Sequence, residues 1–522
     1  MGNHFSSRLR PTATLRASGE PGDSATSTHS LSRTDPVRLS NPIAFCGLIF
    51  ALALAGCASV PTPPDATGGQ QALLAECRRH YELDERRIIN AGVRDVEFRL
   101  VPGHPYLRTD RFHAALTDRL DDHAARAIWL EDLARLDTAA RAAEWNNLAP
   151  DIRPGTGERD TLNACRQSLL RNVATDEATF AVLRAAIRVD DNYRDWQRAL
   201  GLYPLTALAV LRGVDRLHAR ENRYFHGTGS ADAPRQRYAA PASDATIEPG
   251  YDTDMNRDVL GIPRIDGVRL RWLMAAHSPI WSVAERSPAD RIGHVTIADT
   301  RIAIDTTRPT QYNYISYTIF EGRVLLQLNY TVWFPERPKR SAFDIYAGRV
   351  DGITWRVTLG DDGHPILADT MHNCGCYYMA FPGPQLRARA ATEVLSEPLW
   401  IPQSMPRAPR GRPVIHLSDG EHYVRGIDWN KPVAAAKPLQ TLDYEKLKNL
   451  PAGAGHYRNL FAADGLVKDS KRGERFVLWP MGIPSAGAMR EAGHHAIAFV
   501  GRRHFDDPDL IDRYFERAGT DP

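Results

Sequence analysis

The sequence predicts an α+β fold, in which an N-terminal helical bundle is followed by a largely antiparallel, β-rich region and a C-terminal helix. Apolar residues recur at helical spacing from residue 71 to about 223, and short runs rich in Tyr, Ile, Val, Trp and Thr follow from 312 onward. With 522 residues, 43% hydrophobic and 25% charged, the chain has the composition of an ordinary folded protein that buries a sizeable core.

The first folded segment is a predicted helical domain over residues 71–229. Its apolar side chains fall on three helical stripes, at Leu74, Cys77, Tyr81 and Ile88, at Leu162, Cys165 and Leu169, and at Phe180, Leu183 and Ile187. These stripes and the alanine-rich stretch 121–145 predict five or six helices. The stretch 102–108 contains two prolines and a glycine, which predicts a packed connecting loop, with a ligand-contacting loop as the alternative.

A polar linker over 230–250 separates this segment from a predicted β-rich domain over 251–522. Glycine-ended turns separate the β-type runs at 321–322, 351–352 and 361–363, and such turns indicate antiparallel hairpins. Between 326 and 332 apolar and polar residues alternate, so one face of that strand is predicted to be buried and the other polar. A last helix is expected over 509–516.

The N-terminal region predicts export rather than a folded domain. Residues 1–36 are expected to be disordered or to precede the true start, and 37–56 have the organisation of a lipoprotein signal peptide. The apolar run 43–56 is shorter than the ~20 residues of a membrane-spanning helix. It ends in Leu54-Ala55-Gly56-Cys57, and 57–70 reads as a lipidated tether.

The Leu54-Ala55-Gly56-Cys57 segment resembles the lipobox of bacterial lipoproteins, which implies a lipid on Cys57 and the bilayer as a partner. Ala58 after the cysteine implies an outer-membrane location on the periplasmic side, with the inner membrane as the alternative. The His-x-Cys-Gly-Cys-Tyr segment from His372 onward is similar to one in uncharacterised proteobacterial lipoproteins, a resemblance that implies no activity.

Cys77 and Cys165 lie on apolar faces of two predicted helices. Buried free cysteines are common in helical cores, whereas an oxidising compartment favours a disulfide between them. Both states are structural.

His372, Cys374 and Cys376 form the densest group of reactive side chains. On a strand they would share one face and could bind zinc or copper, with His494, His495 or His504 completing the site. The alternatives are a Cys374–Cys376 disulfide, either inert or redox-active, and a thiolate nucleophile activated by His372.

A formal net charge of +2, with no basic stripe, gives no support for nucleic-acid binding. No phosphate-binding glycine loop, zinc-protease helix or nucleophile elbow is present in the sequence. The sequence therefore predicts a non-enzymatic binding or assembly component of the envelope, with an unidentified envelope protein as a possible partner. The alternative is an envelope hydrolase, or a redox or metal protein, that uses the His-x-Cys-Gly-Cys group.

Overall fold

A computed structural model of the chain describes residues 68–227, 233–241, 256–390, 395–407, 409, 411–429 and 435–519. The predicted signal peptide, Cys57 and most of the tether lie outside the described residues. Among the helices that are described, none is long and apolar enough to cross a membrane. The described residues belong to one unit, Val60–Pro522, in which helical and strand-rich segments pack together.

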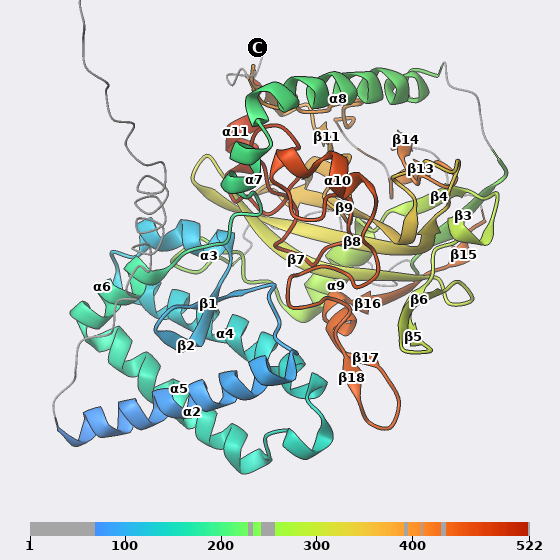
Figure 1. Cartoon of the computed structure of the whole chain (residues 1–522). Helices are drawn as coiled ribbons and strands as arrows, with labels where there is room; N and C mark the ends of the chain where they lie inside the picture. Colours follow the sequence, from blue (N-terminus) through green and yellow to red (C-terminus); the bar gives the residue numbers. More distant parts are fainter. Residues whose placement is uncertain are drawn as a thin grey trace, which may run out of the picture. The chain divides into compact units, whose positions relative to one another are not determined.

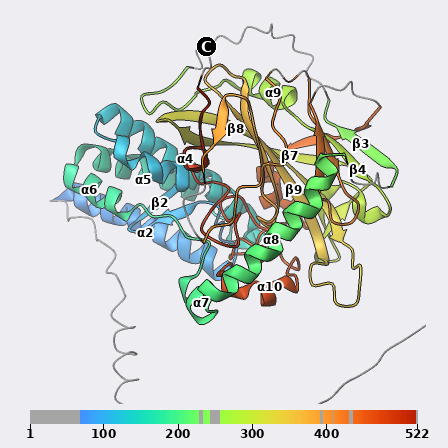
Figure 2. The ribbon, with the colours of Figure 1, turned by 90° about the horizontal axis from the view of Figure 1, so that it is seen from above.

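The fold is α+β, as predicted. Figures 1 and 2 show α2, α4, α5 and α6 grouped around a small hairpin on one side of the main sheet, with α8 on the opposite side. The helices are α2 (Gly69–Ala91), α3 (Arg111–Ala115), α4 (His123–Asn147), α5 (Thr156–Thr175), α6 (Glu177–Ala186), α7 (Asp195–Leu200), α8 (Tyr203–Phe225), α9 (Gly267–Ala276), α10 (Glu474–Val477) and α11 (Leu510–Tyr514).

The helices begin where the sequence provides caps. The side chains of Asp110, Asp122 and Asp176 accept hydrogen bonds from the first-turn amides of α3, α4 and α6. A disulfide joins Cys77 of α2 to Cys165 of α5. Of the two states expected for these cysteines, free or bonded to each other, the structure has the disulfide.

The stretch 102–108 is part of a β-hairpin, so the expectation of a packed connecting loop is wrong. β1 (Arg99–Val101) pairs with β2 (His104–Thr109), and Gly103, at φ 78°, makes the turn between them. Pro102 and Gly103 therefore mark a hairpin turn and not a longer loop. The buried side chain of Arg108 crosses to α4, where Nη2 donates to Glu144 Oε1 at 2.7 Å.

Two larger sheets form the β-rich part. The six-stranded sheet has the order β11 (Met379–Pro382), β10 (Pro365–His372), β9 (Gly348–Leu359), β8 (Arg323–Arg337), β7 (Thr310–Phe320) and β16 (Gln440–Asp443). It is antiparallel except at β16, which runs parallel to β7. The five-stranded sheet has the order β14 (Val424–Asp428), β13 (Val414–Leu417), β4 (Ile280–Ala284), β3 (Arg235–Ala239) and β15 (Lys437–Pro438).

Three small pairs complete the strands. They are β5 (His294–Ala298) with β6 (Arg301–Asp305), β12 (Leu386–Ala388) with β19 (Phe515–Arg517), and β17 (Leu450–Pro451) with β18 (Tyr457–Arg458). The helix expected over 509–516 is shorter in the structure, because α11 ends at Tyr514. The next residues form β19, which pairs with β12.

A large hydrophobic core lies between the two larger sheets. Trp281 of β4 and Ile415 of β13 belong to the same buried cluster as Leu328 of β8 and Trp355 of β9. Burying each large apolar side chain contributes roughly 1.5–3 kcal/mol. This core therefore buries one face of the six-stranded sheet against the five-stranded sheet.

The other face of the six-stranded sheet is polar and also buried. On β8 the predicted alternation holds, since Leu326 and Leu328 enter the inter-sheet core while Gln327 and Asn329 point the other way. Gln327 is 3% exposed and Asn329 is 0% exposed. A buried polar face requires hydrogen-bonding partners, and this face forms one wall of a cavity.

Candidate functional site

A cavity of about 900 Å³ lies between the helical layer and the polar face of the six-stranded sheet. Its walls come from β7, β8 and β9, from α3, α4 and α9, and from the segments around residues 97, 444, 493 and 506. Most binding sites are concave, mainly apolar and set with a few polar groups, and this cavity has that character.

Asn329 in the sheet wall has a free acceptor. Its Nδ2 donates to Ser316 Oγ at 2.9 Å, and Ser316 Oγ donates to Gln327 Oε1 at 2.9 Å. Asn329 Oδ1 is buried and has no hydrogen-bond partner among the described residues. An unsatisfied buried acceptor costs about 1–3 kcal/mol. A ligand that donates a hydrogen bond at this wall would recover that energy.

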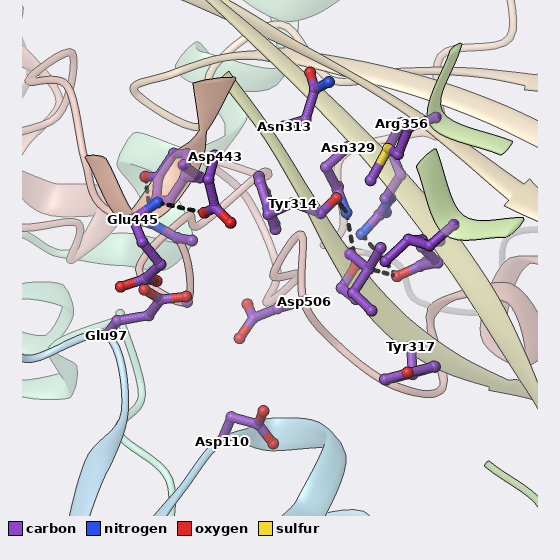
Figure 3. A pocket seen from close by; sticks show the side chains of 18 of the residues that line it. Glu97, Asp110, Asn313, Tyr314, Tyr317, Asn329, Arg356, Asp443, Glu445 and Asp506 are labelled. Carbon is purple, nitrogen blue, oxygen red and sulfur yellow. Dashed lines mark hydrogen bonds between the residues drawn. The ribbon is translucent and has the colours of Figure 1, made fainter. Parts of the chain in front are cut away.

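Five carboxyl side chains line the cavity. Asp443 and Glu445 are close in the chain, and Glu97, Asp110 and Asp506 come from three other segments. Figure 3 shows Glu97, Asp110 and Asp506 opposite the sheet residues Tyr314 and Asn329. Glu97 precedes β1, Asp110 caps α3, and Asp506 lies in the segment before α11. Residues more than 400 positions apart thus converge on one space.

Asp506 is held by one of its oxygens only. Its side chain is 27% exposed, and Oδ2 lies 3.3 Å from Arg111 Nε. Oδ1 is buried and, within the described part of the chain, has no hydrogen-bond partner. Burial raises the pKa of Asp506 to about 6, although the charge of Arg111 acts in the opposite direction.

Asp110 has the opposite electrostatic environment. Burial would raise the pKa of its carboxyl, but the charge of His113 and its hydrogen bonds lower that pKa below the ordinary value. Asp110 Oδ1 accepts from His113 N and lies 2.7 Å from His113 Nδ1. Burial would lower the pKa of His113, but Asp110 and Asp132 raise it to about 9. The carboxylate of Asp110 is therefore ionised at neutral pH.

A buried lysine lies at the end of the cavity that contains Glu97. Lys448 Nζ is 3.1 Å from both Asp95 Oδ2 and Glu445 Oε1, and it also contacts Glu97. Burial raises the pKa of Glu97 to about 8 despite this ammonium group, and the pKa of Glu491 is also raised by burial. More carboxyl groups than cations meet here, so some of them keep their protons at neutral pH.

The His372 segment does not continue as a strand. β10 ends at His372, and the chain turns at Gly375, which has φ 89°. Cys374 and Cys376 therefore do not share a strand face with His372. Burial lowers the pKa of His372 to about 3, and neither ring nitrogen has a hydrogen-bond partner in the described chain.

Cys374 and Cys376 are buried free cysteines in this turn, and the amide of Cys376 donates to Cys374 Sγ at 3.4 Å. Of the three expected partner histidines, His504 lies against the carboxylates of Asp507 and Asp191, and the other two face backbone carbonyls. His494 Nε2 is 2.8 Å from Val96 O, and His495 Nε2 is 3.2 Å from Asn373 O. No group of three or more His, Cys, Asp or Glu side chains in the described residues is arranged to hold a metal ion.

The residues of the cavity were not selected by sequence analysis. Asp110 reads as a helix cap and Asn329 as one polar position in an alternating strand, and both roles are ordinary. Asp506 lies in a charged stretch without a motif. Of the six residues considered for the metal site, only His495 lines the cavity.

Comparison with protein-family models, curated proteins and solved structures finds no match to this chain.

Proposed function

We propose that the mature protein is a lipid-anchored envelope protein, facing the periplasm from the outer membrane, whose folded part binds a saccharide in the cavity. The anchoring proposal rests on the lipobox that ends at Cys57. The binding proposal rests on the buried, unpartnered Oδ1 of Asn329 in the cavity wall.

A saccharide fits the chemistry of this wall. Each hydroxyl group both donates and accepts hydrogen bonds, so it can pair with the amide oxygen of Asn329 and with carboxyl groups such as those of Glu97 and Asp506. The rings of Tyr314 and Tyr317 supply flat apolar surface for the C–H faces of a sugar ring. A cavity of about 900 Å³ has room for a short oligosaccharide.

Calorimetric titration of the mature protein in detergent tests the binding proposal. The probes are chitotriose, cellotriose, maltotriose and soluble peptidoglycan fragments. We expect at least one to bind, and we expect Asn329→Leu to weaken that binding at least tenfold, because the leucine cannot accept a hydrogen bond. Thr331→Val is the matched control, since Thr331 is buried on the same face of β8 but bonds to Thr354 and does not line the cavity. Absence of binding, or equal affinity in the Asn329 variant, would refute the proposal.

Membrane fractionation tests the anchor. Wild-type protein is expected in the outer-membrane fraction of a density gradient and Cys57→Ala in the soluble periplasmic fraction, because loss of the acyl chains removes the anchor. Recovery of the wild type with inner-membrane markers would move the assignment to the inner membrane, and unchanged membrane association of the variant would exclude lipidation as the anchor.

A further inference from the structure

Arg111 connects two of the cavity carboxylates. It follows Asp110 in the chain, and its Nε lies 3.3 Å from Oδ2 of Asp506. Arg111 Nη1 also lies 3.6 Å from Oδ1 of Asp507, which fixes the segment that carries Asp506 next to the start of α3. Both carboxyl side chains remain 27% exposed to the cavity. Both carboxyl groups thus line the same cavity, and Arg111 links the segments that carry them.

The two carboxyl groups differ in how they are bonded. Asp110 Oδ1 accepts from the amide of His113 and faces its ring, an arrangement that stabilises the ionised form. Asp506 has a buried Oδ1 that no described residue contacts by a hydrogen bond, an arrangement that favours the protonated form. A protonated and an ionised carboxyl group in one cavity can act as acid and base in the same reaction.

Burial and the neighbouring charges together set the difference between the pKa values of the two carboxyl groups. Burial raises the pKa of Asp506 to about 6, Arg111 and His504 oppose that shift, and Asp507 adds to it. The pKa of Asp110 is lowered, chiefly by His113 acting against burial. At mildly acidic pH the carboxyl group of Asp506 therefore holds a proton, while that of Asp110 is ionised and can act as a base.

We propose that the protein hydrolyses a glycosidic bond in this cavity, with Asp506 as the general acid and Asp110 as the general base. This inference rests on the saccharide binding proposed above and adds a reaction to it. Paired carboxyl groups in opposite protonation states are the usual machinery of glycoside hydrolysis.

The proposed step is balanced without a cofactor. Asp506 transfers its proton to the glycosidic oxygen as the bond between that oxygen and the anomeric carbon breaks, so the leaving sugar departs as an alcohol. Water attacks the anomeric carbon, and Asp110 takes the proton that water loses. The products are two sugars with one new hydroxyl each, and proton exchange with solvent restores both carboxyl groups.

Reducing-end release, followed with mass spectrometry, tests this activity on the same four probes used for binding. We expect the wild type to cleave a probe that it binds, with each cleavage adding one water. Asp506→Asn and Asp110→Asn are expected to lower the rate at least 100-fold while calorimetry still detects binding. Asp160→Asn is the matched control, because Asp160 is exposed on α5, away from the cavity, and its variant should cleave as fast as the wild type.

The pH profile separates a catalytic role from a structural one. The wild-type rate should fall as pH rises through about 6, because Asp506 then loses its proton. If the wild type binds a saccharide but cleaves none, the hydrolysis proposal is overturned and the binding proposal stands. If nothing binds or is cleaved, both fail. Cleavage that persists in Asp506→Asn excludes this residue as the acid.

Discussion

Arg356 and Asp369 lie directly opposite each other on β9 and β10 and form a buried ion pair with two hydrogen bonds. Arg356 Nε donates to Oδ1 at 2.9 Å, and Nη2 donates to Oδ2 at 2.5 Å. The same guanidinium donates to the carbonyl oxygen of Phe505 at 2.5 Å and stacks on the Phe505 ring. The pair therefore supports the segment that carries Asp506 into the cavity.

Asp369→Asn should lower the free energy of unfolding by about 3–5 kcal/mol, because it leaves the buried charge of Arg356 without its counterion. Urea unfolding measures this loss. Glu516→Gln is the matched control, since its pair with Arg387 is solvent-exposed and should cost less than about 1 kcal/mol. Equal losses of unfolding free energy in the two variants would show that the buried pair stabilises the fold no more than the exposed pair. The double variant Arg356→Met/Asp369→Leu should recover most of the stability.

Gly375 makes the turn between the two free cysteines. A Cβ at this position would lie 2.3 Å from the carbonyl oxygen of Ala496, and φ is +89°. Gly375→Ala should therefore destabilise the fold by about 1–3 kcal/mol more than Gly322→Ala, as measured by urea unfolding. Gly322 is the matched control, because it has φ +77° but nothing within 4 Å of an added Cβ. Equal losses would show that the turn can move away from Ala496.

The Cys77–Cys165 disulfide spans 88 residues of sequence and joins α2 to α5. Cys77→Ala/Cys165→Ala should lower the free energy of unfolding by about 4 kcal/mol, because the unfolded chain then loses a long closed loop. In urea unfolding, reductant should destabilise the wild type and leave this variant unchanged. Cys374→Ala/Cys376→Ala is the control and should keep the response to reductant. A wild type insensitive to reductant would argue against the disulfide.

Local patterns predicted many elements of the fold but not all of them, since β3 (Arg235–Ala239) lies within the stretch 230–250 that was expected to be a linker. The stripe of Leu74, Cys77, Tyr81 and Ile88 is the buried face of α2, and the alternation of β8 orients Leu328 and Asn329 to opposite sides. These predictions succeed because helices and strands present their apolar residues with a fixed period. The hairpin at 99–109 was missed because its strands are short and hold a proline and charged residues.

The cavity could not be read from such patterns. Asp110, Asn329 and Asp506 come from three segments far apart in the chain, and only packing of the helical layer onto the polar face of the sheet brings them together. The prediction that His372, Cys374 and Cys376 share one strand face failed for the opposite reason. These residues are close in sequence, but the turn at Gly375 ends the strand that would have aligned them. Closeness in sequence was therefore a poor guide to the site.

Stability should depend on pH in opposite ways at Asp506 and Asp110. The pKa of Asp506 rises from an ordinary 3.8 to about 6 on folding, so between these values the folded state holds more protons than the unfolded state. The contribution of Asp506 to the free energy of unfolding is therefore fully present below pH 3.8 and is lost as pH rises through 6. Asparagine does not titrate, so Asp506→Asn does not lose this contribution as pH rises. At pH 7 the free energy of unfolding of this variant should be about 1–3 kcal/mol higher than that of the wild type.

Asp110→Asn is the control of opposite sign. Because folding lowers the pKa of Asp110, its contribution is present above pH 3.8 and is lost as pH falls through the folded pKa. The Asp110 variant should therefore be less stable than the wild type at pH 7, where the Asp506 variant is more stable. Urea unfolding at pH 4, 5, 6 and 7 measures both differences. The gain in Asp506→Asn should shrink toward pH 4, and a gain that stays constant with pH would show that Asp506 titrates as an ordinary exposed carboxyl group.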